Sequence, residues 1–463
     1  MKSFFRYISV IFSIALLSSF YGCKKQNGFS KGNLEFSVDT LVFDTVFTTV
    51  GSTTQQFKIY NKENKTVTID EIELVGGANS PFRINIDGIS GDKHTNVQVL
   101  AKDSLFAFVE VTLNVNGQNS PLVIEDSIRF RTNGKDQYVH LAVWGQDAYF
   151  HYQDFNFGTW ANDKPHVIYD RAYVDSAEIL NIKPDTKVYL HKNSILFVYK
   201  GTLNVNGTKD HEVVFQGDRL EQFYKDVAGQ WYGIYFYKSL PSTINYAIIK
   251  NGTAGLHLTA NNEANLPNQF NVTVTNTKIS NNASYGVFLY DSPKIKMENC
   301  IVSKNGIHAL FLLRGGSYDI NHSDLLGFGS TGQTPAIGIR NYYDGIASGI
   351  GFGEIKNSII YGSQTSEIAF DTVNPNNDPT LLNIAFKRCL IKLETPSTNS
   401  MFQDQIVWNI DPIFTNVSEG NFKPVASSPI NGLGNPLYSL SFPFDIDGNP
   451  RDMANPDLGA YEF

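Results

Sequence analysis

Four side chains in the middle of the sequence could take part in acid–base chemistry. They are His257, His308, Arg314 and Arg340. A histidine or an arginine can remove a proton as a general base, and a cation beside it can neutralise a substrate carboxylate. The same four residues also fit an interpretation as surface groups at loop ends. The sequence contains no phosphate-binding Walker loop, H-E-x-x-H zinc motif or G-x-S-x-G elbow. The catalytic residues therefore stay unknown, and we favour a protein that is not an enzyme.

Aromatic side chains recur in a second pattern, each between two apolar residues. Neighbouring residues of a strand point to opposite faces, so Tyr235, between Ile234 and Phe236, points away from the core. One outward column contains Tyr235, His257, Phe288, Phe311, Gly338 and Ala369, and the adjacent column includes Tyr237 and Tyr290. Exposed rings in register could stack on sugar rings or form an apolar interface. The competing interpretation is that a loop or another domain covers this surface.

Three side chains near the C-terminus resemble part of a calcium loop. Asp445, Asp447 and Asn449 occupy alternate positions, as oxygen ligands do in such loops. The twelfth position, where a calcium loop carries Glu, is occupied by Pro456. We therefore favour a structural turn held by Arg451 and a carboxylate, and calcium binding is the alternative. No other metal or cofactor is expected.

The candidate residues of the first two patterns belong to an internal repeat that fills residues 150–410. One apolar column of this repeat contains Ile249, Ile279, Val302, Leu325, Ile360 and Ile391. Ile279, Val302 and Leu325 are 23 residues apart, and loop insertions explain the longer intervals. A single coil of this length cannot bury its own apolar residues, so the coils must stack with their strands about 4.8 Å apart. The repeat resembles right-handed parallel β-helix proteins, a fold that often hosts enzymes that cut polysaccharides.

A second column of the repeat consists of small residues, which suits a crowded corner where the chain bends. Two of its members are Cys300 and Cys389, which lie three coils apart. Strand spacing separates them by about 14 Å, whereas a disulfide needs its Cα atoms within about 7 Å. We therefore expect both cysteines to be buried free thiols.

Residues 34–147 follow a different pattern, in which short alternating runs are separated by turn residues. Examples are residues 56–60 and 106–111, with Asn133-Gly134 as one of the turns. Several short strands at this spacing indicate a β-sandwich. The order of landmarks from Val50-Gly51 onward resembles Hydin-type immunoglobulin-like domains. The predicted fold class is therefore all-β, with an N-terminal immunoglobulin-like sandwich followed by a right-handed parallel β-helix.

The first residues have the features of a secretory signal. Basic residues precede an apolar run over residues 8–17, which is too short to span a bilayer. Gly22-Cys23 resembles the lipobox of bacterial lipoproteins, such as those of Bacteroidetes. This resemblance implies that residues 1–22 are removed, that Cys23 carries the lipid and that residues 23–33 form a linker. The protein would then be anchored in the outer membrane, facing the periplasm or the cell surface. An ordinary signal peptide or an anchor helix is the alternative.

Residues 411–463 carry a signature of their own. It includes Asp411-Pro412-Ile413-Phe414, Asp445-Ile446-Asp447-Gly448-Asn449-Pro450 and Asp457-Leu458-Gly459-Ala460-Tyr461-Glu462. The order of these motifs resembles the closing segment of the parallel β-helix proteins grouped as choice-of-anchor Q domains. A solenoid must cover its last apolar coil, so we expect this segment to be the cap.

Composition limits the choice of partners. The chain of 463 residues has a net charge of -8 and no basic domain, which argues against a nucleic-acid partner. Contact with a membrane is expected through the lipid anchor only. A long solenoid flank suits an extended polymer, so the favoured function is non-catalytic binding of a glycan or envelope polymer. The alternatives are a polysaccharide lyase or glycoside hydrolase acting in a groove, and a structural or assembly protein of the envelope.

Overall fold

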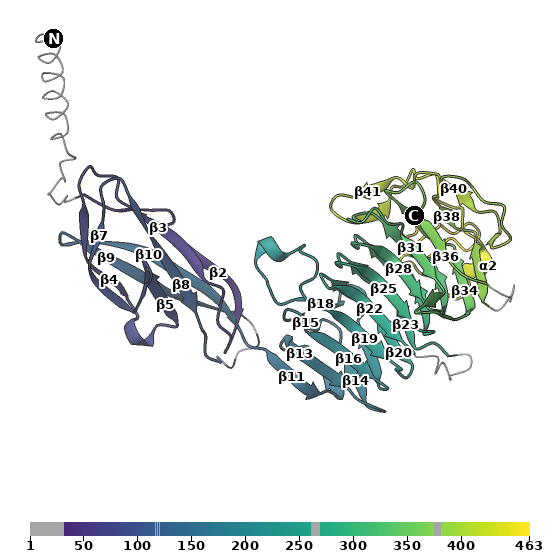
Figure 1. The fold of residues 1–463 in the computed structure, drawn as a ribbon, viewed down its shortest axis with the longest axis horizontal. Coiled ribbons are helices and arrows are strands. Elements are labelled where there is room, and N and C mark those ends of the chain that lie inside the picture. The colour runs from purple at the N-terminus through teal and green to yellow at the C-terminus, as the bar shows by residue number, and fades with distance from the viewer. Residues whose placement is uncertain (1–31, 116, 118, 120, 261–268, 375–380) are drawn as a thin grey trace, which may run out of the picture. The chain divides into compact units, whose positions relative to one another are not determined.

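A computed structural model divides the chain into two compact units, which join at Asp147 and Ala148 (Figure 1). It describes residues 32–115, 117, 119, 121–260, 269–374 and 381–463. Strands dominate both units, and the predicted all-β class, with sandwich-like sheets followed by a parallel β-helix, is confirmed. Within these ranges, no helix is long and apolar enough to cross a membrane.

The first unit contains two five-stranded sheets around one core. One sheet has the order β1 (Glu35–Phe36), β3 (Gln55–Tyr60), β8 (Ser104–Val111), β5 (Phe82–Ile86) and β6 (Ile89–Ser90). The other has the order β2 (Thr40–Phe47), β10 (Lys135–Gln146), β9 (Leu122–Thr132), β4 (Val67–Leu74) and β7 (Lys93–Val99). Residues alternate along each strand, as in β3, where Phe57 and Ile59 are buried and Gln56 is exposed. This alternation packs the inner face of each sheet against the other.

The second unit is a solenoid whose parallel strands form three faces (Figure 1). Face A consists of β12 (Gly158–Trp160), β14 (Ile179–Ile182), β17 (Thr202–Asn206), β20 (Ser242–Asn245), β23 (Val272–Thr275), β26 (Lys294–Glu298), β29 (Gly316–Asn321), β34 (Ile350–Lys356), β37 (Leu382–Lys387) and β39 (Phe402–Gln403). Face B consists of β15 (Lys187–Leu190), β18 (Val213–Gly217), β21 (Ala247–Lys250), β24 (Lys278–Ser280), β27 (Ile301–Ser303), β30 (Asp324–Gly327), β35 (Ile359–Gly362), β38 (Leu390–Ile391) and β40 (Val407–Trp408).

Face C carries the predicted aromatic columns. It consists of β11 (Tyr149–Phe155), β13 (His166–Val174), β16 (Ile195–Tyr199), β19 (Gly233–Tyr237), β22 (Ala254–Thr259), β25 (Tyr285–Tyr290), β28 (His308–Leu313), β31 (Ile337–Arg340) and β36 (Ile368–Asp371). The long strand β13 bends round a corner and pairs with both β15 and β16. Small hairpins follow at β32 (Tyr342–Tyr343) with β33 (Ile346–Ala347), and at β41 (Phe414–Asn416) with β42 (Asn421–Pro424).

The inward residues of successive coils stack into one core, because parallel pairing places equivalent residues opposite each other. Leu256, Val287 and Leu310 are opposite one another on face C, and all three are fully buried. Phe370 is an exception: strand alternation predicts that it points inward, like Ile339 with which it pairs, but this side chain is 40% exposed. Its strand, β36, is the last one of face C in the described part of the chain, so no later strand of that face covers the ring.

The column of small residues lies at the corner between faces A and B. Asn276 and Asn299 turn this corner with φ of 50° and 51°, a conformation that Asn tolerates better than most residues. The next residues, Thr277 and Cys300, are fully buried. Thr277 Oγ1 accepts a hydrogen bond from the Ala247 N–H at 3.3 Å, which links two coils. The tight corner therefore explains why the column contains only small side chains.

The two cysteines of this column are buried free thiols, as predicted. Burial raises the pKa of both Cys300 and Cys389 to about 12, because an apolar environment disfavours the thiolate. Neither thiol is therefore activated as a nucleophile.

The C-terminal segment packs along the outside of face B, which differs from the predicted cap over the last coil. Its apolar residues form a core with outward residues of β27, β30, β35 and β38, and this core includes Phe422, Ile446, Leu458, Ile301 and Ile359. The end of the solenoid core is instead contacted by residues of and around the last coil, namely Leu393, Met401, Phe402, Ile406 and Trp408. The difference arises because face B carries apolar side chains on its outer side as well.

Arg451 fastens this segment to the solenoid. Its guanidinium is fully buried, forms an ion pair with Glu462 at 3.1 Å and donates a hydrogen bond to Asn299 Oδ1 at 2.9 Å. It also donates to the carbonyl oxygen of Gly459 at 3.1 Å. The predicted pair between Arg451 and a carboxylate is thus present. It connects the C-terminal segment to a corner residue about 150 positions earlier in the chain.

Replacement of Arg451 should destabilise the second unit strongly. Arg451→Ala leaves the buried Glu462 carboxylate without its cation, and removing one partner of a buried pair costs about 3–5 kcal/mol. Lys423→Ala is the control, because its pair with Asp447 is partly exposed and should contribute less than about 1 kcal/mol. Denaturant unfolding followed by tryptophan fluorescence measures both. Equal losses in the two variants would contradict this role of Arg451.

Candidate functional site

The aromatic residues predicted to point outward do form a continuous column on face C. Tyr235 lies opposite His257, which lies opposite Phe288, and Phe288 lies opposite Phe311. The successive ring centroids are 4.2, 4.7 and 5.6 Å apart. In the adjacent column, Tyr237 pairs with Thr259, which pairs with Tyr290. Strand register therefore brings the predicted residues together on one surface.

The column extends further toward the N-terminus than the sequence analysis predicted. Phe155 pairs with Tyr173, Tyr173 with Phe197, and Phe197 with Tyr235. The ring centroids along this extension are 5.6, 5.9 and 5.1 Å apart. We call the resulting series the aromatic strip, and it comprises Phe155, Tyr173, Phe197, Tyr235, His257, Phe288 and Phe311. The missed signal was present in β16, where Phe197 lies between the inward residues Leu196 and Val198.

The strip is neither fully exposed nor covered. Most of its rings are half-buried against their neighbours, while Phe155 at one end is 64% exposed. Tyr290 beside the strip packs against Tyr343 of the β32–β33 hairpin, with 6.2 Å between the ring centroids. At the other end the column continues as Gly338 and Ala369. The surface thus combines apolar ring faces with phenol hydroxyls over several consecutive coils.

His257, the first of the candidate general bases, lies within the strip. It is 8% exposed, and burial lowers its pKa to about 4 because the imidazolium would lose its hydration. Its Nδ1 shares a hydrogen bond with the Tyr232 hydroxyl at 2.8 Å, and Tyr235 stacks on its ring. At neutral pH His257 is therefore an uncharged part of the aromatic surface and a weak base.

His308, the second candidate, supports the end of the strip. Its Nδ1 donates to the carbonyl oxygen of Pro335 at 2.6 Å, and burial lowers its pKa. A Cβ atom at Gly338 would lie 2.7 Å from His308 Nε2 and 2.9 Å from Phe311 Cδ2. The glycine thus leaves space for both rings. His308 acts here as packing for the strip.

The two arginine candidates form separate ion pairs. Arg314 Nε lies 3.4 Å from a carboxylate oxygen of Asp291, and Arg340 Nε donates to Asp371 at 2.7 Å. Tyr342 donates a second hydrogen bond to Asp371 at 2.9 Å. Since each guanidinium has its own carboxylate, neither is positioned as a free cation beside a histidine base. The four candidates share face C or its margin, but the hydrogen bonds described here do not join them into one catalytic group.

The calcium candidates form a turn. Asp445 Oδ1 accepts the N–H of Asn449 at 2.7 Å, and its Oδ2 accepts the N–H of Glu462 at 2.9 Å. Asp447 instead pairs with Lys423 at 2.8 Å. The Asp445 oxygens are therefore used by backbone donors, and the described residues contain no group of three acidic, His or Cys side chains placed to hold a metal ion.

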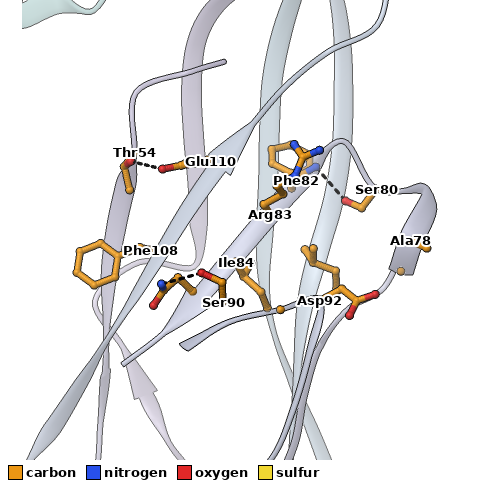
Figure 2. A pocket seen from close by; sticks show the side chains of 14 residues that line it. Thr54, Ala78, Ser80, Phe82, Arg83, Ile84, Ser90, Asp92, Phe108 and Glu110 are labelled. Atoms are coloured by element: carbon orange, nitrogen blue, oxygen red, sulfur yellow. Dashed lines mark hydrogen bonds between the residues drawn. The ribbon is translucent and has the colours of Figure 1, made fainter. Parts of the chain in front are cut away.

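The sandwich unit has a cavity of about 540 Å³, to which no predicted site residue belongs (Figure 2). Apolar Phe82, Ile84 and Phe108 line it together with polar residues that include Arg83 and Asp92. Thr54 donates to Glu110 at 2.6 Å, and the Phe82 N–H donates to Ser80 at 3.1 Å. The polar groups shown in Figure 2 are thus partly engaged within the fold, and the lining residues offer no histidine or cysteine for catalysis.

The predicted lipidation residue Cys23 lies outside the described residues.

Comparison with known proteins supports the architecture of the second unit. A family model described as a right-handed beta helix region matches residues 180–325, which run from β14 to β30. This match confirms the predicted handedness of the solenoid. No curated protein matches the sequence.

Three solved structures are similar to parts of the chain at low TM-scores. A family 123 glycoside hydrolase from Clostridium perfringens, studied for glycolipid glycan hydrolysis, is 6% identical with a TM-score of 0.19, over 26% of this chain and 30% of that one. The ASH or PapD-like domain 7 of human CEP192 is 10% identical with a TM-score of 0.17, over 25% of this chain and 84% of that one. The catalytic domain of Agl-KA is 9% identical with a TM-score of 0.20, over 76% of this chain and 91% of that one. Likenesses this weak carry no argument about function, so the right-handed β-helix region is what the comparisons establish.

Proposed function

We propose that the protein binds an extended glycan along face C of its β-helix and does not cleave it. The aromatic strip is the observation that carries this proposal. Its residues follow one another on consecutive strands, so at about 4.8 Å per strand the strip is about 29 Å long. Aromatic rings with polar edges offer apolar faces for sugar rings and hydroxyls for sugar hydrogen bonds. A surface of this length suits a polymer better than a single sugar.

Binding without catalysis is supported by the state of the candidate catalytic side chains. His257 is buried and bonded to Tyr232, and His308 is bonded to the Pro335 carbonyl. Arg314 and Arg340 are engaged by carboxylates of their own. A lyase needs a free base next to a cation that neutralises the substrate carboxylate. The present arrangement offers neither on the strip.

We further propose that the protein acts in a bacterial cell envelope, anchored through Cys23 as a lipoprotein of the Bacteroidetes type. This part rests on the sequence of residues 1–23 alone. A lipid at Cys23 would tether the chain to the outer membrane, facing the periplasm or the cell surface. A polymer of the envelope or its surroundings is then the accessible ligand.

Truncation of two strip residues should weaken glycan retention. The test is a panel of uronate-containing and neutral glycans, with retention and release of unsaturated product measured together. Phe288→Ala with Phe311→Ala should lower the retention of neutral glycans at least tenfold, and each change should reduce the free energy of unfolding by only about 1–2 kcal/mol, because the rings are half-buried. Phe352→Ala is the control, since this ring is 39% exposed on β34 of face A.

Two results would overturn the proposed function. Equal retention by the double variant and the Phe352→Ala control would exclude the strip as the binding surface. Turnover of any glycan by the wild-type protein would replace non-catalytic binding with the lyase or hydrolase alternative.

The anchor has a separate test in bacterial cells. Metabolic labelling with a palmitate analogue should label the wild-type protein, and Cys23→Ala should remove the label, because the thiol is the predicted attachment point. A wild-type protein without label would contradict the lipoprotein proposal and would leave the glycan-binding proposal untouched.

A further inference from the structure

A groove on the outside of face B is distinct from the aromatic strip on face C. Its floor is formed by β21, β24 and β27, with Lys250, Ser280 and Ser303 among the lining residues. Asp226, from the loop before β19, and Glu419, from the β41–β42 hairpin, also line it. The volume of the groove is about 800 Å³, which is in the range of small-ligand sites.

The groove is rich in lysine although the chain as a whole is acidic. Lys250, Lys278 and Lys304 line it, and Lys225 lies close enough to repel Lys250. Two carboxylates, Asp226 and Glu419, line the groove and only partly balance the charge of these four lysines. The whole chain has a net charge of -8. A local excess of positive charge in a concave site raises the local concentration of anions.

The cations at the centre of the groove are incompletely compensated. Within the described part of the chain, neither Lys250 nor Lys278 forms an ion pair. Burial lowers the pKa of Lys250, and the nearby Lys225 lowers it further, whereas Asp226 opposes both effects. Lys304 is held by a hydrogen bond that it donates to the Ser418 carbonyl at 2.7 Å. An anion in the groove would therefore offset the repulsion between Lys250 and Lys225.

The other groups of the groove suit a sugar. Ser280, Asn281, Ser303 and Asn421 add hydroxyl and amide groups among the lysines. Lys250 belongs to β21, Lys278 to β24, and Lys304 directly follows β27. Because successive strands are about 4.8 Å apart, the lysines are spread over about 10 Å along the solenoid. Repeated charges on a short chain fit this spread better than one isolated anion.

We propose that this groove on face B binds an acidic oligosaccharide segment, whose negative groups contact Lys250 and Lys278 while its hydroxyls contact the serine and asparagine side chains. This site goes beyond the function proposed for the aromatic strip and does not depend on it. The two sites use different faces and different chemistry, ring stacking on face C and charge on face B.

Titration calorimetry with three probes tests the proposal on the purified protein at low ionic strength. The probes are trigalacturonate, the neutral maltotriose and inorganic phosphate. Trigalacturonate should bind, maltotriose should not bind to the groove, and added NaCl should weaken the binding of trigalacturonate by screening. Binding of phosphate without trigalacturonate would overturn the assignment to a sugar ligand, and so would a failure of trigalacturonate to bind.

Variants locate the binding to this groove. Lys250→Gln with Lys278→Gln should weaken trigalacturonate binding at least tenfold without lowering the melting temperature. Lys183→Gln with Lys192→Gln removes the same charge at exposed positions outside the groove and should leave binding unchanged. Equal losses in the two pairs would overturn the proposal. Phe288→Ala with Phe311→Ala should bind trigalacturonate as the wild type does in this assay, and loss of binding there would move the acidic ligand to the strip.

Discussion

In-register pairing of parallel strands is the constraint on which the second unit depends. Each coil satisfies its backbone hydrogen bonds only through the coils above and below it, so equivalent residues must lie opposite one another. The pairing of Tyr235 with His257 and of His257 with Phe288 follows from this constraint. It converts an aromatic residue that recurs once per coil into a continuous strip. The same pairing stacks Leu256 and Val287 on the inner side. One strand register therefore determines both the apolar core and the aromatic strip.

The corners and the C-terminal segment keep this register in place. Asn276 and Asn299 turn the chain between faces A and B, and the buried side chains after them bond to neighbouring coils. Arg451 then joins the C-terminal segment to Asn299, while the buried His322 shares hydrogen bonds with Ser439 and the Gly459 carbonyl. With these contacts in place, the C-terminal segment covers part of the outer side of face B over several coils. The groove lined by Lys250, Lys278 and Lys304 stays open next to the covered part, with Glu419 among its lining residues.

Residue periodicity predicted the solenoid and most of its columns, because strand alternation and coil length are both local properties. The outward positions of Phe288 and Phe311 could be derived in this way. The strip was predicted too short, since the predicted column began at Tyr235 although Phe197 follows the same alternation one coil earlier. The path of the C-terminal segment depends on contacts such as His322 with Ser439, over 117 positions, which no local pattern encodes. The groove on face B was missed for the same reason, because the loop before β19 contributes Asp226 and the C-terminal segment contributes Glu419 to it.

Disulfide trapping measures the register of face C directly. In a chain with Cys23→Ser, Phe288→Cys combined with Phe311→Cys places two thiols on opposed residues of adjacent strands, where the Cα atoms are about 5 Å apart and within disulfide range. Phe288→Cys combined with Leu313→Cys moves one thiol by two residues along its strand. The two Cα atoms are then about 8 Å apart, which is beyond disulfide range. Mild oxidation followed by mass spectrometry should detect a disulfide in the first pair and free thiols in the second. A disulfide in the second pair, or free thiols in the first, would contradict the register that builds the aromatic strip.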